Sequence, residues 1–216
     1  MNGQGKVFVE VMGRPLITWT LGAFKRCDAV DDVVVVASPD GLERMRALVR
    51  EWRFDDKVTA VVPGGATRQD SVRAGLEASD GAAIVAVHDG ARPMVTSDMI
   101  ARGIVLAREH GAALCAIRAR DTVKEVSGNP PVVMTTPARD RMWLAQTPQC
   151  FDRALLIEAH ALPQGSAPVT DDASLVEAMG RRVVVYEGAP SNFKVTTPED
   201  LIVAEALLRE RLNASG

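Results

Sequence analysis

The segment Asp-Val-Val-Val-Val-Ala at residues 32–37 is the clearest indication of the fold, because a short run of β-branched residues is typical of a strand buried on both faces. Three further runs share this character: VTAVV at 58–62, AAIVAVH at 82–88 and AALCAI at 112–117. Amphipathic helical patterns lie between them, at residues 16–26, 42–52, 71–78 and 98–110. Strands that alternate with helices predict βαβ units, and therefore a Rossmann-like α/β fold whose mostly parallel sheet carries helices on both faces.

The later part of the chain interrupts this alternation. Residues 121–145 carry two short apolar runs separated by Ser-Gly-Asn-Pro-Pro, which predicts a β-arm that projects from the sheet. Beyond the arm we expect helices at 152–162, 171–179 and 198–212 and a strand at 182–187. Thr197 is the expected N-cap of the last helix, with Pro198 at its first position. Residues 1–216 are thus predicted to form a single domain.

Composition excludes several classes of protein. A net charge of −3 argues against a nucleic-acid binder, which usually shows a basic face. The longest apolar run is strand-sized, so no membrane association is expected. Three distant cysteines predict neither a disulfide framework nor a zinc site. The first residues lack the apolar stretch of a signal peptide, and we expect a cytoplasmic protein.

Two loops follow predicted strands at the edge where ligands bind in sheets of this kind. In the first, Gly64 and Gly65 let the backbone approach a ligand, and the next helix offers free N–H groups to an anion or a base edge. A plain strand-to-helix turn capped by Thr67 explains the same residues equally well. In the second, Asp89 and Arg92 follow a buried strand directly.

Charged groups in such a position are costly unless they are paired or used, which favours a functional role for Asp89. This carboxylate could hold ribose or substrate hydroxyls, or lie near a metal-bound phosphate. The alternative is an Asp89–Arg92 pair that only closes the loop. His88, just before it, is interpreted as structural, since no Ser or Cys partner indicates a triad.

Two later segments, TPQ at 147–149 and NFKVT at 192–196, are predicted loops at the same edge. Together the loops and the arm would bring five cationic side chains to one rim: Lys6, Arg68, Arg92, Arg139 and Lys194. A cationic rim in a slightly acidic protein suits a phosphorylated small molecule better than a nucleic acid.

Six ordered motifs resemble those of one enzyme family, the 2-C-methyl-D-erythritol 4-phosphate cytidylyltransferases of the non-mevalonate isoprenoid pathway. They are GGATRQDSVRAGL (64–76), VHDGARP (87–93), RDTVK (120–124), AQTPQ (145–149), TDDAS (170–174) and NFKVTTPEDL (192–201). The resemblance implies that the acceptor phosphate attacks the α-phosphorus of CTP, that pyrophosphate leaves, and that Mg²⁺ arrives with the triphosphate. It implies no metal site made of protein side chains alone.

The resemblance also implies roles for individual residues. Lys6 would stabilise the pentacoordinate α-phosphate, and Arg139 and Lys194 would aim the attacking phosphate. Nucleotide contacts would come from Gly64, Gly65, Ala66, Ser71 and Gly90. Acceptor contacts would come from Asp89, Arg92, Thr122, Arg139, Thr147, Thr170 and Lys194. The arm at 121–145 would reach into a second subunit, so that a homodimer is expected, with Thr122 and Arg139 serving the partner's site.

The resemblance also implies an opening strand and a glycine-rich, arginine-containing loop ahead of Lys6, and neither has a counterpart here. Residue 1 falls inside that loop, and about 20 residues are missing relative to the family pattern. A truncated or late-started sequence explains this better than a natural loss, because a gap in the middle of a sheet leaves backbone groups unpaired.

Two other functions stay open. One is a cytidylyltransferase for another polyol phosphate such as ribitol 5-phosphate, whose family shares much of the pattern. The other is a truncated, non-catalytic nucleotide-binding homologue. A dehydrogenase is disfavoured, because no GxGxxG motif is followed by an acid about 20 residues later.

Overall fold

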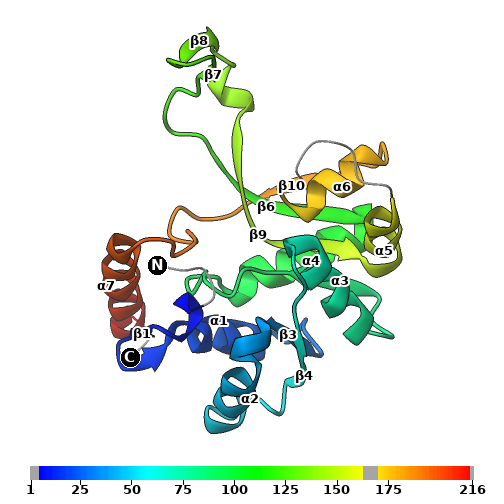
Figure 1. Ribbon diagram of the computed structural model, residues 1–216, viewed down its shortest axis with the longest axis vertical. Helices are drawn as coiled ribbons and strands as arrows, with labels where there is room; N and C mark the ends of the chain where they lie inside the picture. Colours follow the sequence, from blue (N-terminus) through cyan, green and yellow to red (C-terminus); the bar gives the residue numbers. More distant parts are fainter. Residues whose placement is uncertain (1–4, 163–169, 215–216) are drawn as a thin grey trace.

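The computed structural model describes residues 5–162 and 170–214, and its centre is a four-stranded sheet with the order β10-β6-β9-β5 (Figure 1). The four strands are β5 (Ile84–Val87), β6 (Ala112–Arg118), β9 (Trp143–Asp152) and β10 (Val184–Glu187). Strands β6 and β10 are parallel, whereas β9 is antiparallel to both of its neighbours. The expectation of a mostly parallel sheet is therefore wrong for this part, because the chain returns from the arm directly alongside β6.

A second, two-stranded parallel sheet contains the segment that first indicated the fold. Its strands are β3 (Val33–Ala37) and β4 (Val58–Pro63), joined by the short helix η2 (Pro39–Gly41) and by α2 (Leu42–Glu51). All five predicted strands are present in the structure, with ends that differ from the predicted ones by at most two residues.

Helices cover both faces of the central sheet, as predicted. One core lies on the face of α1 (Leu16–Lys25) and α4 (Ser97–His110), and it includes Phe24, Ile100 and Tyr186. The other core lies on the face of α5 (Arg153–Ala161) and α6 (Asp172–Ala178), where Phe151 packs with Leu156. A further cluster includes residues of α1 and of α7 (Pro198–Ala214). No helix in the described part of the chain is long and apolar enough to cross a membrane.

Helix α3 (Arg68–Ala78) begins three residues before the predicted start at Ser71. Its start is fixed by a capping box, in which Thr67 Oγ1 accepts from the Asp70 N–H at 3.1 Å and an Asp70 carboxylate oxygen accepts from the Thr67 N–H at 3.1 Å. The same arrangement joins Thr197 and Asp200 at the start of α7, which confirms the predicted N-cap there.

The predicted arm is a hairpin of β7 (Glu125–Ser127) and β8 (Val132–Thr135), followed by η3 (Arg139–Arg141), and it projects far from the body (Figure 1). Its side chains include four exposed apolar residues: Val126, Val132, Val133 and Met134. At the other end of the sequence, η1 (Lys6–Phe8) precedes a small hairpin of β1 (Glu10–Val11) and β2 (Arg14–Pro15) that the sequence analysis did not predict.

A cavity of about 1030 Å³ separates β3 from β5, and we refer to it as the slot. Residues 33–37 of β3 and residues 82–90 around β5 line the slot, together with residues of α1, η1 and α3. Within the described residues, β3 pairs with β4 alone and β5 pairs with β9 alone, so each strand presents an unpaired edge to the slot.

Candidate active site

An ion cluster forms where β5 ends. The two carboxylate oxygens of Asp89 accept from Lys194 Nζ at 3.2 Å and from Arg92 Nε at 3.1 Å. Burial of Asp89 opposes ionisation, but the two cations outweigh it and hold its pKa below the usual range. The predicted Asp89–Arg92 pair therefore exists, and Lys194, 105 residues further along the chain, joins it. The Lys194 side chain keeps 48% of its surface exposed and is available to an incoming anion.

The segment that carries Lys194 is held against the sheet by Asn192, which is fully buried. Asn192 Nδ2 donates to the Thr147 carbonyl at 2.8 Å, and the Asn192 carbonyl accepts from Arg92 Nη1 at 2.8 Å. The Val195 N–H donates to the Ala91 carbonyl at 2.9 Å. Sequence analysis assigned no role to Asn192, although it opens the NFKVTTPEDL motif.

Thr147 lies inside β9 and not in a loop, so the loop expected at residues 147–149 is wrong. The strand continues there because β5 offers a partner in register, with Val87 opposite Gln149. Thr147 is 5% exposed, and its Oγ1 accepts from the Asp89 N–H at 3.1 Å. The same oxygen lies 2.9 Å from His88 Nδ1. Thr147 therefore connects β9 directly to the ion cluster.

The glycine-rich turn lies between β4 and α3. The Gly65 N–H donates to Ser71 Oγ at 3.2 Å, and that hydroxyl donates to the Thr67 carbonyl at 3.0 Å. A Cβ atom at Gly65 would collide with Asp70, so the capped turn itself requires this glycine. The turn is capped by Thr67, as the plain structural interpretation expected, and Ala66 and Gly65 remain exposed at its tip.

A buried network joins α3, α5 and α6 beside this turn. Asp172 has no solvent exposure and accepts from Arg68 Nη2 at 2.6 Å and from His160 Nε2 at 3.0 Å. Its burial raises its pKa, but its bonds to His160 and Arg68 have the larger combined effect, and the pKa is lowered. Gln149 Oε1 accepts from the Asp172 N–H at 3.2 Å.

This network corrects one expectation. The sequence predicts Arg68 among the cations of the rim, whereas its guanidinium pairs with the buried Asp172. The sequence does not predict this network, because its members lie far apart along the chain. The one sequence feature that pointed to it was Asp172, the second Asp of the TDDAS motif.

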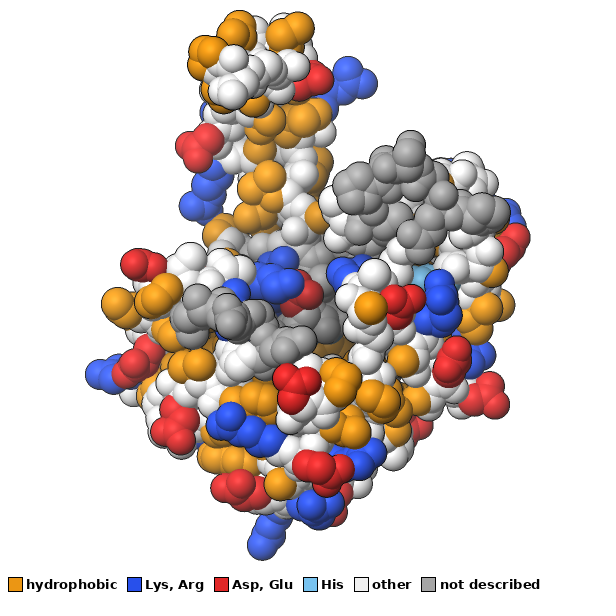
Figure 2. Space-filling view, in the orientation of Figure 1, with side chains coloured by type: hydrophobic (Ala, Val, Ile, Leu, Met, Phe, Trp, Pro, Cys, Tyr) orange, Lys and Arg blue, Asp and Glu red, His pale blue; other side chains and the backbone are white. Residues whose placement is uncertain are grey.

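Among the described contacts, the other predicted residues do not touch the ion cluster. Lys6 is half-buried in η1. The residue after it, Val7, lines the slot, as does Gly90. Thr170 is exposed just before α6. Thr122 and Arg139 are exposed at the base of the hairpin, where Arg139 Nη1 donates to the Arg120 carbonyl at 3.1 Å. Figure 2 shows basic side chains next to an acidic one in the hollow between the hairpin and the body.

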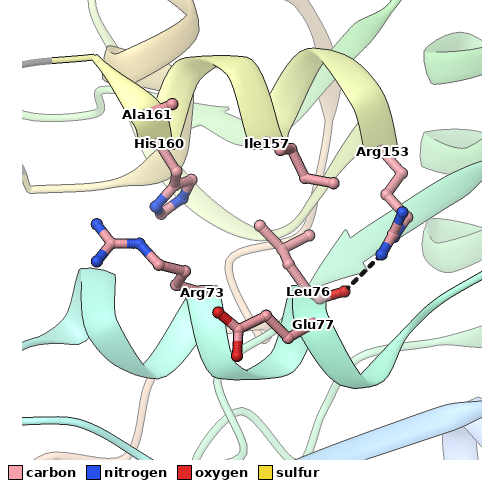
Figure 3. A pocket seen from close by; sticks show the side chains of 7 residues that line it. All are labelled: Arg73, Leu76, Glu77, Arg153, Ile157, His160 and Ala161. Atoms are coloured by element: carbon pink, nitrogen blue, oxygen red, sulfur yellow. Dashed lines mark hydrogen bonds between the residues drawn. The ribbon is translucent and has the colours of Figure 1, made fainter.

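A separate groove of about 240 Å³ lies between α3 and α5 (Figure 3). The Arg73 and His160 side chains approach each other at one end, and Arg153 donates to the Leu76 carbonyl at 2.9 Å at the other. This groove contains none of the predicted site residues. The described residues also contain no cluster of three or more potential metal ligands.

Comparison with known proteins identifies the family. The family model described as 2-C-methyl-D-erythritol 4-phosphate cytidylyltransferase matches residues 1–210. A protein of that name from Alkaliphilus oremlandii is 40% identical over 209 residues, which cover 95% of this chain and 88% of the relative. Another from Halalkalibacterium halodurans is 41% identical over 210 residues, which cover 97% and 91%.

Solved structures agree. The crystal structure of 2-C-methyl-D-erythritol 4-phosphate cytidylyltransferase from Thermus thermophilus aligns with a TM-score of 0.79 and 39% identity, over 96% of this chain and 95% of that chain. The 4-diphosphocytidyl-2C-methyl-D-erythritol synthase from Anaerococcus prevotii aligns with a TM-score of 0.85 and 32% identity, over 95% and 94%. Since the family model matches nearly the whole chain, the chain belongs to the 2-C-methyl-D-erythritol 4-phosphate cytidylyltransferase family.

Proposed function

We propose that this protein transfers a cytidylyl group from CTP to 2-C-methyl-D-erythritol 4-phosphate, with release of pyrophosphate, in the cytoplasm. The observation that carries the proposal is the convergence of Asp89, Arg92 and Lys194 at the end of β5, next to Thr147. Such a cluster offers an acceptor for hydroxyls and two donors for phosphate at one point. A polyol phosphate needs both kinds of partner.

The reaction would require positioning more than covalent chemistry. An oxygen of the acceptor phosphate attacks the α-phosphorus, and the bond from that phosphorus to the bridging oxygen of pyrophosphate breaks. Lys194 would exchange its contact with Asp89 for the acceptor phosphate, and the carboxylate oxygen that it leaves would accept from polyol hydroxyls while Arg92 holds the other oxygen. Lys6 would stabilise charge on the α-phosphate. Gly65 and Ala66 would offer backbone groups to the cytosine edge. The rest of the nucleotide-binding surface would be formed by Gly64, Ser71 and Gly90.

Mg²⁺ would enter as part of the nucleotide substrate. Asp89 is engaged by two cations in this structure, and the described residues contain no group of three or more potential metal ligands. Phosphate oxygens would therefore supply most of the ligands, as is usual for this ion. When bound, Mg²⁺ neutralises charge on the triphosphate.

The hairpin β7–β8 would form the arm of a homodimer. Its four exposed apolar side chains, 53–65% accessible, have no cover within the described chain, and a second copy would cover them. Thr122 and Arg139 would then reach the partner's site together with Thr170 of that partner. Deletion of residues 124–136 should give a monomer in analytical ultracentrifugation and a raised KM for the acceptor. A monomer with unchanged KM would exclude sharing of the arm.

We also propose that one further strand completes the sheet in the slot. A five-residue strand fills about 800 Å³ at ordinary strand and layer spacings, so the slot is large enough to hold one. Unpaired edges on β3 and β5 would supply its hydrogen bonds. An added N-terminal segment of apolar β-branched residues, joined through a glycine-rich linker, should raise the melting temperature, whereas the same segment with two prolines should not. Equal melting temperatures would refute the proposal.

Pyrophosphate release tests the function directly. Release should require CTP together with 2-C-methyl-D-erythritol 4-phosphate, and ribitol 5-phosphate should be a poor acceptor. Release with ribitol 5-phosphate alone would support the other polyol-phosphate activity, and CTP binding without turnover would indicate a non-catalytic homologue. Lys194→Ala should reduce turnover strongly at unchanged stability. Arg209→Ala, which removes an exposed ion pair with Glu205 at 2.8 Å within α7, is the control.

A further inference from the structure

His88 stands between the end of β5 and Asp89, and the proposed reaction gives it no role. Its ring packs against Phe24, with centroids 5.2 Å apart. Nδ1 lies 2.9 Å from Thr147 Oγ1, whereas Nε2 is buried and has no hydrogen-bond partner among the described residues. Burial lowers the pKa of His88 to about 4, so the imidazole is neutral at pH 7 and carries one proton.

The position of that proton follows from the partners. If it were on Nε2, a buried N–H group would have no acceptor within hydrogen-bond distance among the described residues, the Arg92 backbone being near the ring but not bonded to that nitrogen, and such a group is costly in folded proteins. If it is on Nδ1, Nε2 is only an unfilled acceptor, which costs less. The Nδ1–H group then donates to Thr147 Oγ1, and this oxygen also accepts from the Asp89 N–H at 3.1 Å. Both lone pairs of the threonine oxygen are thereby filled.

A hydroxyl whose two lone pairs are filled cannot accept another hydrogen bond, so any further bond must be one in which it donates. The Thr147 hydroxyl is thus prepared to donate to an oxygen that arrives at the ion cluster. The same contacts fix the backbone of Asp89, whose carboxylate lies between Arg92 and Lys194. A single imidazole therefore controls the direction of one donor and the placement of one acceptor.

We propose that His88 is a positioning residue, which as the Nδ1–H tautomer turns the Thr147 hydroxyl outward as a donor to the phosphorylated acceptor and holds Asp89 in place. The part that concerns the acceptor rests on the proposed function. The hydrogen-bond arrangement does not, and it can be tested without turnover.

Nitrogen-15 NMR of the histidine rings tests the arrangement in the intact protein at pH 7. We expect a protonated Nδ1 and an unprotonated Nε2 for His88. The signals of this ring are assigned as those that disappear in His88→Asn. The Asp89 amide should exchange with solvent slowly in the wild type and in His88→Asn, and at least tenfold faster in His88→Leu. A protonated Nε2, or equal exchange in all three proteins, would overturn the inference.

Kinetics test the consequence for the acceptor. His88→Leu should raise the acceptor KM by about tenfold, the cost of one hydrogen bond, with little change in the CTP KM. His88→Asn should restore most of the loss, because its amide nitrogen can occupy the place of Nδ1. In a Thr147→Val background, His88→Leu should add nothing. Effects that multiply, or an Asn variant as poor as the Leu variant, would refute the role. If the wild type released no pyrophosphate, the proposed function would fail while the NMR result still decided the arrangement.

Discussion

Asp172 offers the sharpest test of how the candidate site is built. Asp172→Ala leaves the Arg68 guanidinium and the His160 ring without the carboxylate that lies 2.6 and 3.0 Å from them. Breaking a buried ion pair from one side costs about 3–5 kcal/mol. Because 36% of the Arg68 side chain is exposed and can turn toward water, we expect the lower end, about 3 kcal/mol.

Urea denaturation measures this cost. With a slope of about 3 kcal/mol per molar urea, the midpoint should fall by about 1 M. Asp56→Ala removes an exposed carboxylate that also pairs with a cation, and it should leave the midpoint nearly unchanged. Asp172→Ala should also raise the KM for CTP more than that for the acceptor, because Arg68 is the first residue of α3, next to the glycine-rich turn. Equal midpoints for the two variants would refute the reasoning.

The pH dependence of the same variant has a defined sign. The folded-state pKa of Asp172 is lowered, so its stabilising contribution is full above the pKa of the unfolded chain and is lost as the pH falls through the folded-state value. The difference in stability between the wild type and Asp172→Ala should therefore shrink in acid. A difference that grew on acidification would contradict the lowered pKa.

Three other predictions concern separate parts of the molecule. Asp89→Asn should raise the KM of the acceptor more than that of CTP in steady-state kinetics, and the reverse order would move Asp89 to the nucleotide. Gly103→Ala should destabilise the protein by about 1–3 kcal/mol in thermal unfolding, because the new Cβ would lie 2.5 Å from Tyr186 Oη and 2.6 Å from Cys150 Sγ. Gly22→Ala is the helical control and should not destabilise, because its Cβ would meet only the flexible end of Arg26. The folded-state pKa of His88 is lowered to about 4, so the unfolded chain binds the extra proton first as the pH falls. The stability of the wild type should therefore decrease from about pH 6.5 to pH 4, and His88→Asn should make this decrease smaller.

The sequence predicted the elements well, because local patterns decide them. The five apolar runs became strands, and the Thr197 cap starts α7 as expected. Residues 143–152 were missed, since this strand contains Gln146, Thr147 and Gln149, which are polar yet buried. Their burial depends on partners from other segments, such as Asn192 and the α6 backbone, and no local pattern contains that information.

The same reason explains the uneven prediction of the site. Asp89 was found because a charged group directly after a buried strand is conspicuous. The pairing of Arg68 with Asp172 and the contact of His88 with Thr147 link residues 104 and 59 positions apart, and only the fold brings them together. The family resemblance indicated Thr147 and Lys194, but not that the Thr147 hydroxyl would accept from the backbone N–H of Asp89.

The slot between β3 and β5 also has a bearing on how this chain behaves in concentrated solution. Two strand edges that no other described segment pairs with, and that face one cavity, are templates on which an extended segment of another molecule can be captured. Such capture would link molecules end to end through backbone contacts, in a manner unrelated to the hairpin and without a fixed number of subunits. The extent of such association would rise with protein concentration and fall when that opening is filled.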